Sequence, residues 1–134
     1  MGLLQPHGRH RRRHGQAALR QAGLRTVTVA NLAEARAALD AARASGETIA
    51  LASPPDALIQ YGILFFVELT EALAAEYPDF APVIAADCGD RADLAHDAMR
   101  LGLKSIVFRG DPRMAESLAD IAVALAVTFK SHPA

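Results

Sequence analysis

One pattern occurs four times in this chain: a short apolar segment, then a turn, then a segment with helical spacing of its apolar residues. The apolar segments span 26–29, 48–52, 82–86 and 105–108. Repeated strand–helix alternation predicts a parallel sheet with right-handed crossovers, because parallel strands need a connection long enough to cross the sheet. Short, mostly apolar strands are typical of sheets that helices cover.

Caps and helix breakers mark the ends of the expected helices. Asn31 precedes the first helix, with Glu34 at the capping-box position, and Gly46 follows its last turn. Asp111 is the expected cap of the last helix, with Pro112 at its first position. The helices are expected at 32–45, from after Asp56 or from Gly62 to about 77, at 91–101, and at 112–129.

The length of the chain suits one domain. It has 134 residues, of which 51% are hydrophobic, so it can bury a core. We expect a single α/β domain over residues 15–130, an open three-layer βα repeat with about four parallel strands, as in flavodoxin-like and receiver folds. A half-barrel completed by oligomerisation is the alternative, because four units do not close an eight-stranded barrel.

The first fourteen residues differ from the rest in charge. They hold four arginines, at positions 9, 11, 12 and 13, and no acidic residue. We predict a disordered basic tail, with a polyanion-binding arm as the alternative, and a short helix over 15–23. Without those arginines, ten basic residues stand against 15 acidic ones, so we expect no nucleic-acid partner.

Cysteine content and hydropathy indicate the compartment. Cys88 is the only cysteine, so no internal disulfide forms. No apolar run reaches the roughly 18 residues of a membrane span, and no apolar segment follows the N-terminal arginines as in a secretory signal. We expect a soluble cytoplasmic protein with no membrane partner.

Two expected helices are apolar around most of their circumference. One contains the run 63–67, and the other is apolar at most positions from 118 to 129. A helix that covers one face of a sheet needs only one apolar stripe. The two helices could pack on each other, but we favour a homo-oligomer interface.

Polar residues follow each expected strand. The carboxyl ends of parallel strands share one edge, where open α/β sheets bind ligands. The turn Asp87-Cys88-Gly89-Asp90 carries two acids and the only cysteine to that edge. The candidate ligand-binding residues there are Asn31, Ser53, Asp87, Cys88, Asp90, Arg109 and Gly110.

Arg109 and Gly110 form the most suggestive part of this set. An arginine at a strand end, followed by a glycine and a helix N-terminus, suits an anion such as a phosphate group. The chain has no Walker A or dinucleotide-binding glycine pattern, so we expect no cofactor.

Other chemistry at this edge is less well supported by the sequence. A nucleophilic Cys88 is disfavoured, because the neighbouring acids raise a thiol pKa and no histidine stands as an obvious base. Asp90 is interpreted as the N-cap of the next helix. Asp87 and Asp90, with Asp56 or Asp111, match no standard metal-binding spacing, so we expect no metal.

From Gln16 onward, the order of elements resembles a response-regulator receiver domain that lacks its first strand. The segment 98–108, AMRLGLKSIVF, is similar to that family's penultimate helix and last strand. The family's acidic pair belongs to the missing strand, its phosphoacceptor position falls near Ser53, and its conserved lysine position falls at Arg109. The resemblance implies a degenerate receiver that is not phosphorylated in the usual way.

A closer resemblance, over residues 26–122, is to short bacterial α/β proteins of unassigned function. The shared features are the strand ending IALASP at 49–54, the pair Tyr61-Gly62 and the turn at 87–90. This resemblance implies the fold and no activity. The same segments also resemble part of a phosphate-binding barrel.

Three functions fit these patterns. We favour a homo-oligomeric module that binds a small anionic, phosphorylated ligand, anchored by Arg109 and the amides near Gly110. A degenerate receiver-like module that contacts proteins through the helix at 63–76 is the second. A lyase- or aldolase-type enzyme that uses Asp87 or Cys88 is the third, although no lysine follows a strand. Whether the protein is an enzyme is therefore left open.

Overall fold

The computed structural model describes residues 24–132, which form an open five-stranded sheet with every strand parallel. The strands are β1 (Arg25–Thr28), β2 (Ile49–Ala52), β3 (Ile84–Asp87), β4 (Ser105–Phe108) and β5 (Thr128–Ser131). The helices are α2 (Leu32–Ser45), α3 (Ala57–Tyr61), α4 (Ile63–Glu76), α5 (Ala92–Arg100) and α6 (Pro112–Leu125). The predicted open parallel α/β fold is confirmed, with five strands in place of about four.

The strands lie across the sheet in sequence order, β1-β2-β3-β4-β5. The flavodoxin-like order is 2-1-3-4-5, and removal of its strand 1 leaves a consecutive order like this one. Because the order never reverses, the described sheet lacks the switch point at which such folds usually form a ligand crevice.

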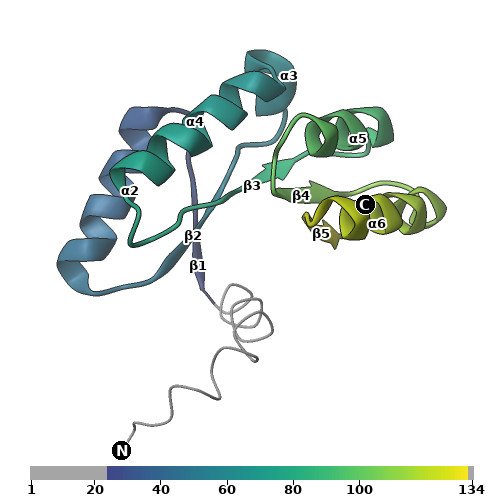
Figure 1. Ribbon diagram of the computed structural model, residues 1–134. Coiled ribbons are helices and arrows are strands. Elements are labelled where there is room, and N and C mark those ends of the chain that lie inside the picture. Colours follow the sequence, from purple (N-terminus) through teal and green to yellow (C-terminus); the bar gives the residue numbers. More distant parts are fainter. Residues whose placement is uncertain (1–23, 133–134) are drawn as a thin grey trace, which may run out of the picture.

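The described helices share one core on one face of the sheet. In Figure 1, α2, α3 and α4 gather beside β1 and β2, whereas α5 and α6 gather beside β4 and β5. Right-handed crossovers between consecutive strands place all the helices on the same side. Residues of this core include Val27, Leu51, Ile84, Ile106 and Phe108 from the strands, and Leu39, Phe66, Met99 and Leu118 from the helices.

The opposite face of the sheet is built from small and polar residues. Side chains alternate between faces along a strand, so the neighbours of the core residues point to this second face. Examples are Thr26, Ala50, Ala85, Ser105 and Thr128. The buried helical side chains belong to the first face, so residues 24–132 place no second helical layer here. The predicted tail and the helix at 15–23 lie outside the described residues.

Local signals explain most helix ends. Helix α2 begins after Asn31 and ends at Gly46, as predicted. The segment from Asp56 to Tyr77 forms two helices, because Gly62 adopts φ 92° and ψ 153° and interrupts the helical path. Both predicted start points are therefore used, one for α3 and one for α4.

The predicted helix over 112–129 is wrong beyond Leu125. Ala126 adopts a left-handed conformation (φ 58°, ψ 44°), and its N–H donates to the carbonyls of Ala122 and Val123. The chain then forms β5, which pairs with β4. Phe129 therefore lies in a strand, where its ring stacks on Phe108 with 6.3 Å between centroids.

Within residues 24–132, no helix has both the length and the apolar character that a bilayer crossing requires.

Candidate functional site

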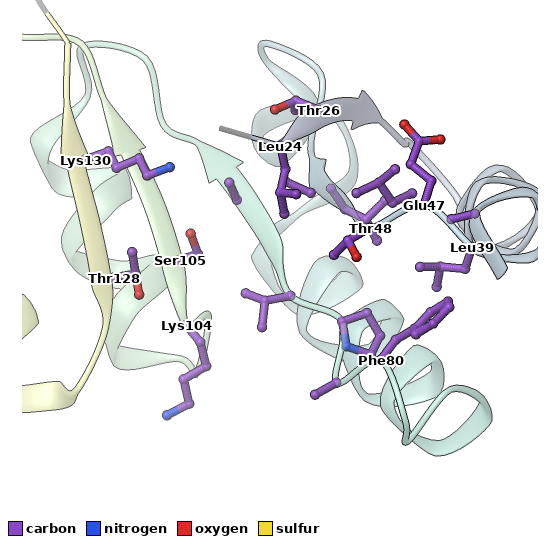
Figure 2. A pocket seen from close by; sticks show the side chains of 18 of the residues that line it. Leu24, Thr26, Leu39, Glu47, Thr48, Phe80, Lys104, Ser105, Thr128 and Lys130 are labelled. Carbon is purple, nitrogen blue, oxygen red and sulfur yellow. The ribbon is translucent and has the colours of Figure 1, made fainter. Parts of the chain in front are cut away.

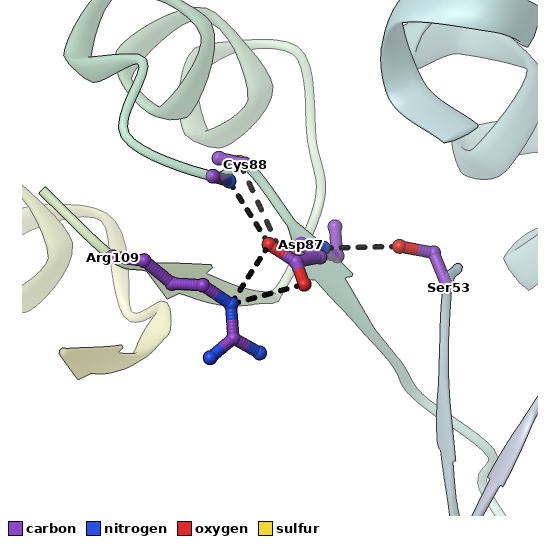
Figure 3. Close-up of polar contacts among 6 residues, drawn as sticks. Ser53, Asp87, Cys88 and Arg109 are labelled. Carbon is purple, nitrogen blue, oxygen red and sulfur yellow. Dashed lines mark hydrogen bonds and ion pairs between the residues drawn. The ribbon is translucent and has the colours of Figure 1, made fainter. Parts of the chain in front are cut away.

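The structure brings Ser53, Asp87 and Arg109 together at the carboxyl edge of the sheet (Figure 3). Pairing between β2 and β3 continues past the end of β2, because the Ser53 N–H donates to the Ala85 carbonyl at 2.9 Å. The Ser53 hydroxyl accepts the Asp87 backbone N–H at 3.0 Å. Both residues are buried, with 4% and 9% of their surface exposed. We call these three residues the Arg109 cluster.

Register explains how Arg109 reaches Asp87. Asp87 pairs with Val107 in the sheet, and Arg109 is two residues further along, so both side chains lie on the face opposite the helices. Arg109 Nε donates to Asp87 Oδ2 at 3.2 Å and to Oδ1 at 3.4 Å. The terminal guanidinium nitrogens point away from this carboxylate in Figure 3 and bond no other side chain or backbone group of the described residues.

The turn after β3 is held by several bonds. Asp87 Oδ1 also accepts the Gly89 N–H at 2.9 Å. The Gly89 carbonyl accepts the Arg109 N–H at 2.7 Å, and the Val107 carbonyl accepts the Cys88 N–H at 2.9 Å. Asp87 therefore stabilises the turn and orients Arg109 at the same time.

Gly110 has a packing role. A Cβ on this residue would lie 2.6 Å from Phe108 Cζ and 3.1 Å from the Asp90 carbonyl oxygen. The helix that follows offers few amides to an anion, because Asp111 Oδ1 accepts the Arg113 N–H at 2.7 Å and Pro112 has no N–H. An anion at this edge would therefore meet the Arg109 guanidinium.

The prediction that Asp90 caps α5 is wrong. The N-cap residue is Arg91, and no side chain makes the capping bond. Strand β3 extends to Asp87 and is followed by a turn at Gly89 (φ 58°), so the helix begins one residue later than expected. Asp90 is exposed beside Gly110.

Cys88 is buried, with 2% of its surface exposed. Its thiol lies 3.7 Å from the Ala86 carbonyl oxygen. Burial, with a smaller contribution from the Asp87 charge, raises the pKa of the thiol to about 12. Cys88 is therefore protonated at neutral pH and lies beneath the surface.

Asn31 is separate from the Arg109 cluster, because β2 lies between β1 and β3. Its Oδ1 accepts the Glu34 N–H at 2.8 Å, and Glu34 Oε1 accepts the Ala30 N–H at 2.7 Å. The predicted capping box is confirmed. Asn31 also borders a hollow of about 260 Å³ beside Phe65 and Glu68 of α4.

The described residues contain no group of three or more His, Cys, Asp or Glu side chains placed to hold a metal ion. Asp111 caps α6, as predicted. Asp56 precedes α3 with φ 67° and makes no side-chain capping bond.

A second cavity lies toward the amino ends of the strands, and no residue of the Arg109 cluster lines it. We call it the sheet pocket; it has a volume of about 560 Å³, and residues of the second face such as Thr26, Ser105 and Thr128 line part of it (Figure 2). Strands β2 and β3 pair only at Leu51–Ile84 and Ala52–Ala85, so Ile49 and Ala50 at the start of β2 have no partner in β3. Both residues line the pocket, as does Leu39 of α2. Polar residues of its lining include Thr26, Glu47, Thr48, Lys104, Ser105, Thr128 and Lys130.

Sequence reasoning missed this pocket for two reasons. The sequence places ligands at the carboxyl edge only, and it assigns residues 128 and 129 to a helix. Lys104 immediately precedes β4, and Lys130 lies in β5. The one sequence feature that pointed to this pocket was Lys104, a lysine just before an apolar strand.

No family model matches the chain, and no curated protein matches it either.

Proposed function

We propose that this protein is a non-catalytic binding module for a small anionic ligand with a phosphate group, held at the carboxyl edge of the sheet. The observation that carries this proposal is the orientation of Arg109. Asp87 holds its Nε, and its terminal nitrogens remain directed away from Asp87. A guanidinium held in this way suits bidentate recognition of phosphate. Ser53 and Asp87 position the arginine.

The same edge favours binding over catalysis. The Cys88 thiol is buried, and burial raises its pKa to about 12, so it is a poor nucleophile. Lys104 lies at the amino end of β4, so it does not stand where a Schiff base with a ligand at Arg109 would need it. These observations argue against the lyase- or aldolase-type alternative.

A thermal-shift and calorimetric titration with inorganic phosphate and glycerol 3-phosphate tests the proposal. Binding to the folded state raises the melting temperature by mass action. Arg109→Ala should abolish this ligand-dependent rise in melting temperature. Arg109→Lys should make the rise smaller, because lysine lacks the planar guanidinium that binds phosphate through two hydrogen bonds. Arg100→Ala removes an arginine from the end of α5 and is the matched control. An unchanged rise in Arg109→Ala would overturn the proposal.

A second candidate function is protein interaction, with a second copy of the chain as the partner. Four large apolar side chains gather on α3 and α4: Ile59, Tyr61, Leu64 and Phe65. Tyr61 and Leu64 are 53% and 57% exposed, and the Tyr61 and Phe65 rings lie 5.3 Å apart. We call this set the α3–α4 surface. An apolar cluster of this kind is typical of interfaces, and it lies in the segment that a receiver-like interaction module would use.

Light scattering at two concentrations tests self-association. We expect an average mass above that of the monomer and a shift toward the monomer in Leu64→Glu. Met114→Glu, which places the same charge at an exposed apolar position of α6, should leave the mass unchanged. A wild-type monomer at both concentrations would exclude the homo-oligomer.

The described charges do not support a nucleic-acid partner. Residues 24–132 hold nine basic and 15 acidic residues. Six of the nine basic residues pair with carboxylates. A phosphate backbone needs a continuous basic face.

A further inference from the structure

One wall of the sheet pocket is polar, and the facing wall combines apolar residues with Thr26, Glu47 and Thr48. In Figure 2, Lys104, Ser105, Thr128 and Lys130 stand on the side formed by β4 and β5. The facing side includes Leu24, Ile49, Phe80, Pro82 and Val83. The volume of about 560 Å³ lies within the range of small-molecule sites, which are mostly apolar with a few placed polar groups.

Ser105 brings to this pocket a hydroxyl group that no other described residue bonds. The residue is 8% exposed, and its hydroxyl has no partner among the described residues. The two other buried polar residues, Ser53 and Asp87, are bonded to each other. Buried hydroxyl groups are normally hydrogen-bonded, so a ligand atom would satisfy the Ser105 hydroxyl.

Unpaired positive charge is concentrated at the same wall. Within residues 24–132, three basic residues make no ion pair with a carboxylate: Lys104, Arg113 and Lys130. Two of the three line the pocket, and the Lys130 ammonium points across its opening in Figure 2. Glu47 also lines the pocket, but Arg25 engages both of its carboxylate oxygens at 2.8 Å.

We propose that the sheet pocket binds a small amphipathic anion, with its acidic head group at Lys130 and Ser105 and its apolar body against Val83 and Leu24. This site is independent of the Arg109 cluster and does not rest on the proposed function. Carboxylate and phosphate head groups share the required chemistry, so the experiment includes both.

Isothermal titration of the full chain with octanoate, octyl phosphate and 1-octanol tests the site. We expect saturable one-to-one binding of at least one of the two anions and at least tenfold weaker binding of the neutral alcohol. Lys130→Ala should weaken anion binding about tenfold, because it removes a charged hydrogen bond. Ser105→Ala should also weaken it. Arg113→Ala, which removes the third unpaired charge from outside the pocket, should have no effect.

A variant that fills the pocket supplies an independent readout. Ala50→Leu adds volume on the second face of the sheet and should abolish octanoate binding while the melting curve stays cooperative. Arg109→Ala should leave octanoate binding intact, which separates this proposal from the previous one.

Several results would overturn the proposal. Equal affinity for 1-octanol would mean an apolar site without anion recognition. Unchanged binding in both Lys130→Ala and Ala50→Leu would place the ligand elsewhere. Absence of binding to either anion would mean that the pocket is not a site for small amphipathic anions.

Discussion

Arg109 and Asp87 form an ion pair whose main effect is to orient the Arg109 side chain. The Arg109 side chain is 46% exposed, and ion pairs at such positions contribute about 0–1 kcal/mol to stability. Asp87 is much more buried and bonds the turn as well as the guanidinium. Loss of Arg109 should therefore affect ligand binding far more than folding.

Gly110→Ala should destabilise the protein by about 1–3 kcal/mol, because overpacking a buried site forces its neighbours to move. The added Cβ would lie 2.6 Å from Cζ of Phe108, which is fully buried. Chemical denaturation measures the loss. Phe108→Leu removes that Cζ atom, so the double variant should lose less than the sum of the single variants. A loss in the double variant equal to the sum of the two single losses would contradict a clash between the added Cβ and Phe108.

Cys88 should make stability fall at alkaline pH. Its pKa is about 12 in the folded state, against an ordinary value of 9.0. Between these values the unfolded state releases the thiol proton and the folded state keeps it, so the free energy of unfolding decreases as pH rises. Below pH 9 this loss is absent. Denaturation of wild type and Cys88→Ala at pH 8 and pH 10.5 should show a wild-type advantage that shrinks at the higher pH; a constant difference would contradict it.

At the scale of elements, the predictions are confirmed where a residue type strongly prefers one position or conformation. The Asn31–Glu34 capping box, the Asp111-Pro112 start and the strand 105–108 all occur as predicted. The end of α6 was missed because Ala126, a strong helix former, occupies a left-handed position that glycine usually fills. Because no glycine marks the end of α6, the sequence of β5 could not be told apart from a further turn of that helix.

Two of the predicted N-cap residues, Asn31 and Asp90, should differ in their effect on stability. Asn31→Ala should cost about 1 kcal/mol, because the Glu34 N–H loses its acceptor. Asp90→Ala should cost much less, since Asp90 makes no capping bond. Urea denaturation of both variants measures the difference, and equal costs would show that the capping bond contributes little.

Ala126→Gly should stabilise the protein by up to about 1 kcal/mol. The left-handed conformation costs an alanine roughly 1–2 kcal/mol, and the larger entropy of glycine in the unfolded chain offsets part of the gain. Thermal denaturation measures the change. Ala122→Gly, inside α6, should instead destabilise. A loss of stability in Ala126→Gly would contradict the assigned helix end.

At the scale of the whole molecule, the sequence predicted the parallel α/β sheet but not the position of the sheet pocket. The alternation of elements predicts which strands are parallel, whereas the pocket depends on where pairing between β2 and β3 stops. The candidate edge was predicted in part. Ser53, Asp87 and Arg109 meet because of strand register, whereas Asn31 and Asp111 serve as caps, and Cys88 is buried.

Both proposed sites lie on the same face of the sheet. Asp87 and Val107 pair in register, and Val107 pairs in turn with Lys130, so all three belong to the face opposite the helices. The Arg109 cluster stands at the carboxyl edge of this face, and the sheet pocket stands toward the amino edge. The face that the described helices leave uncovered is therefore the face that we expect to bind ligands.

A two-dimensional ¹H–¹⁵N NMR titration of the full chain with inorganic phosphate tests the central claim most directly. Binding at the Arg109 cluster predicts saturable shifts of the Arg109 Nε–H signal and of the Gly89 and Arg109 amides. The amides of Ser105 and Thr128 in the sheet pocket should remain unshifted. Shifts confined to the pocket, or an unchanged Arg109 Nε–H signal at saturation, would contradict anion binding by Arg109.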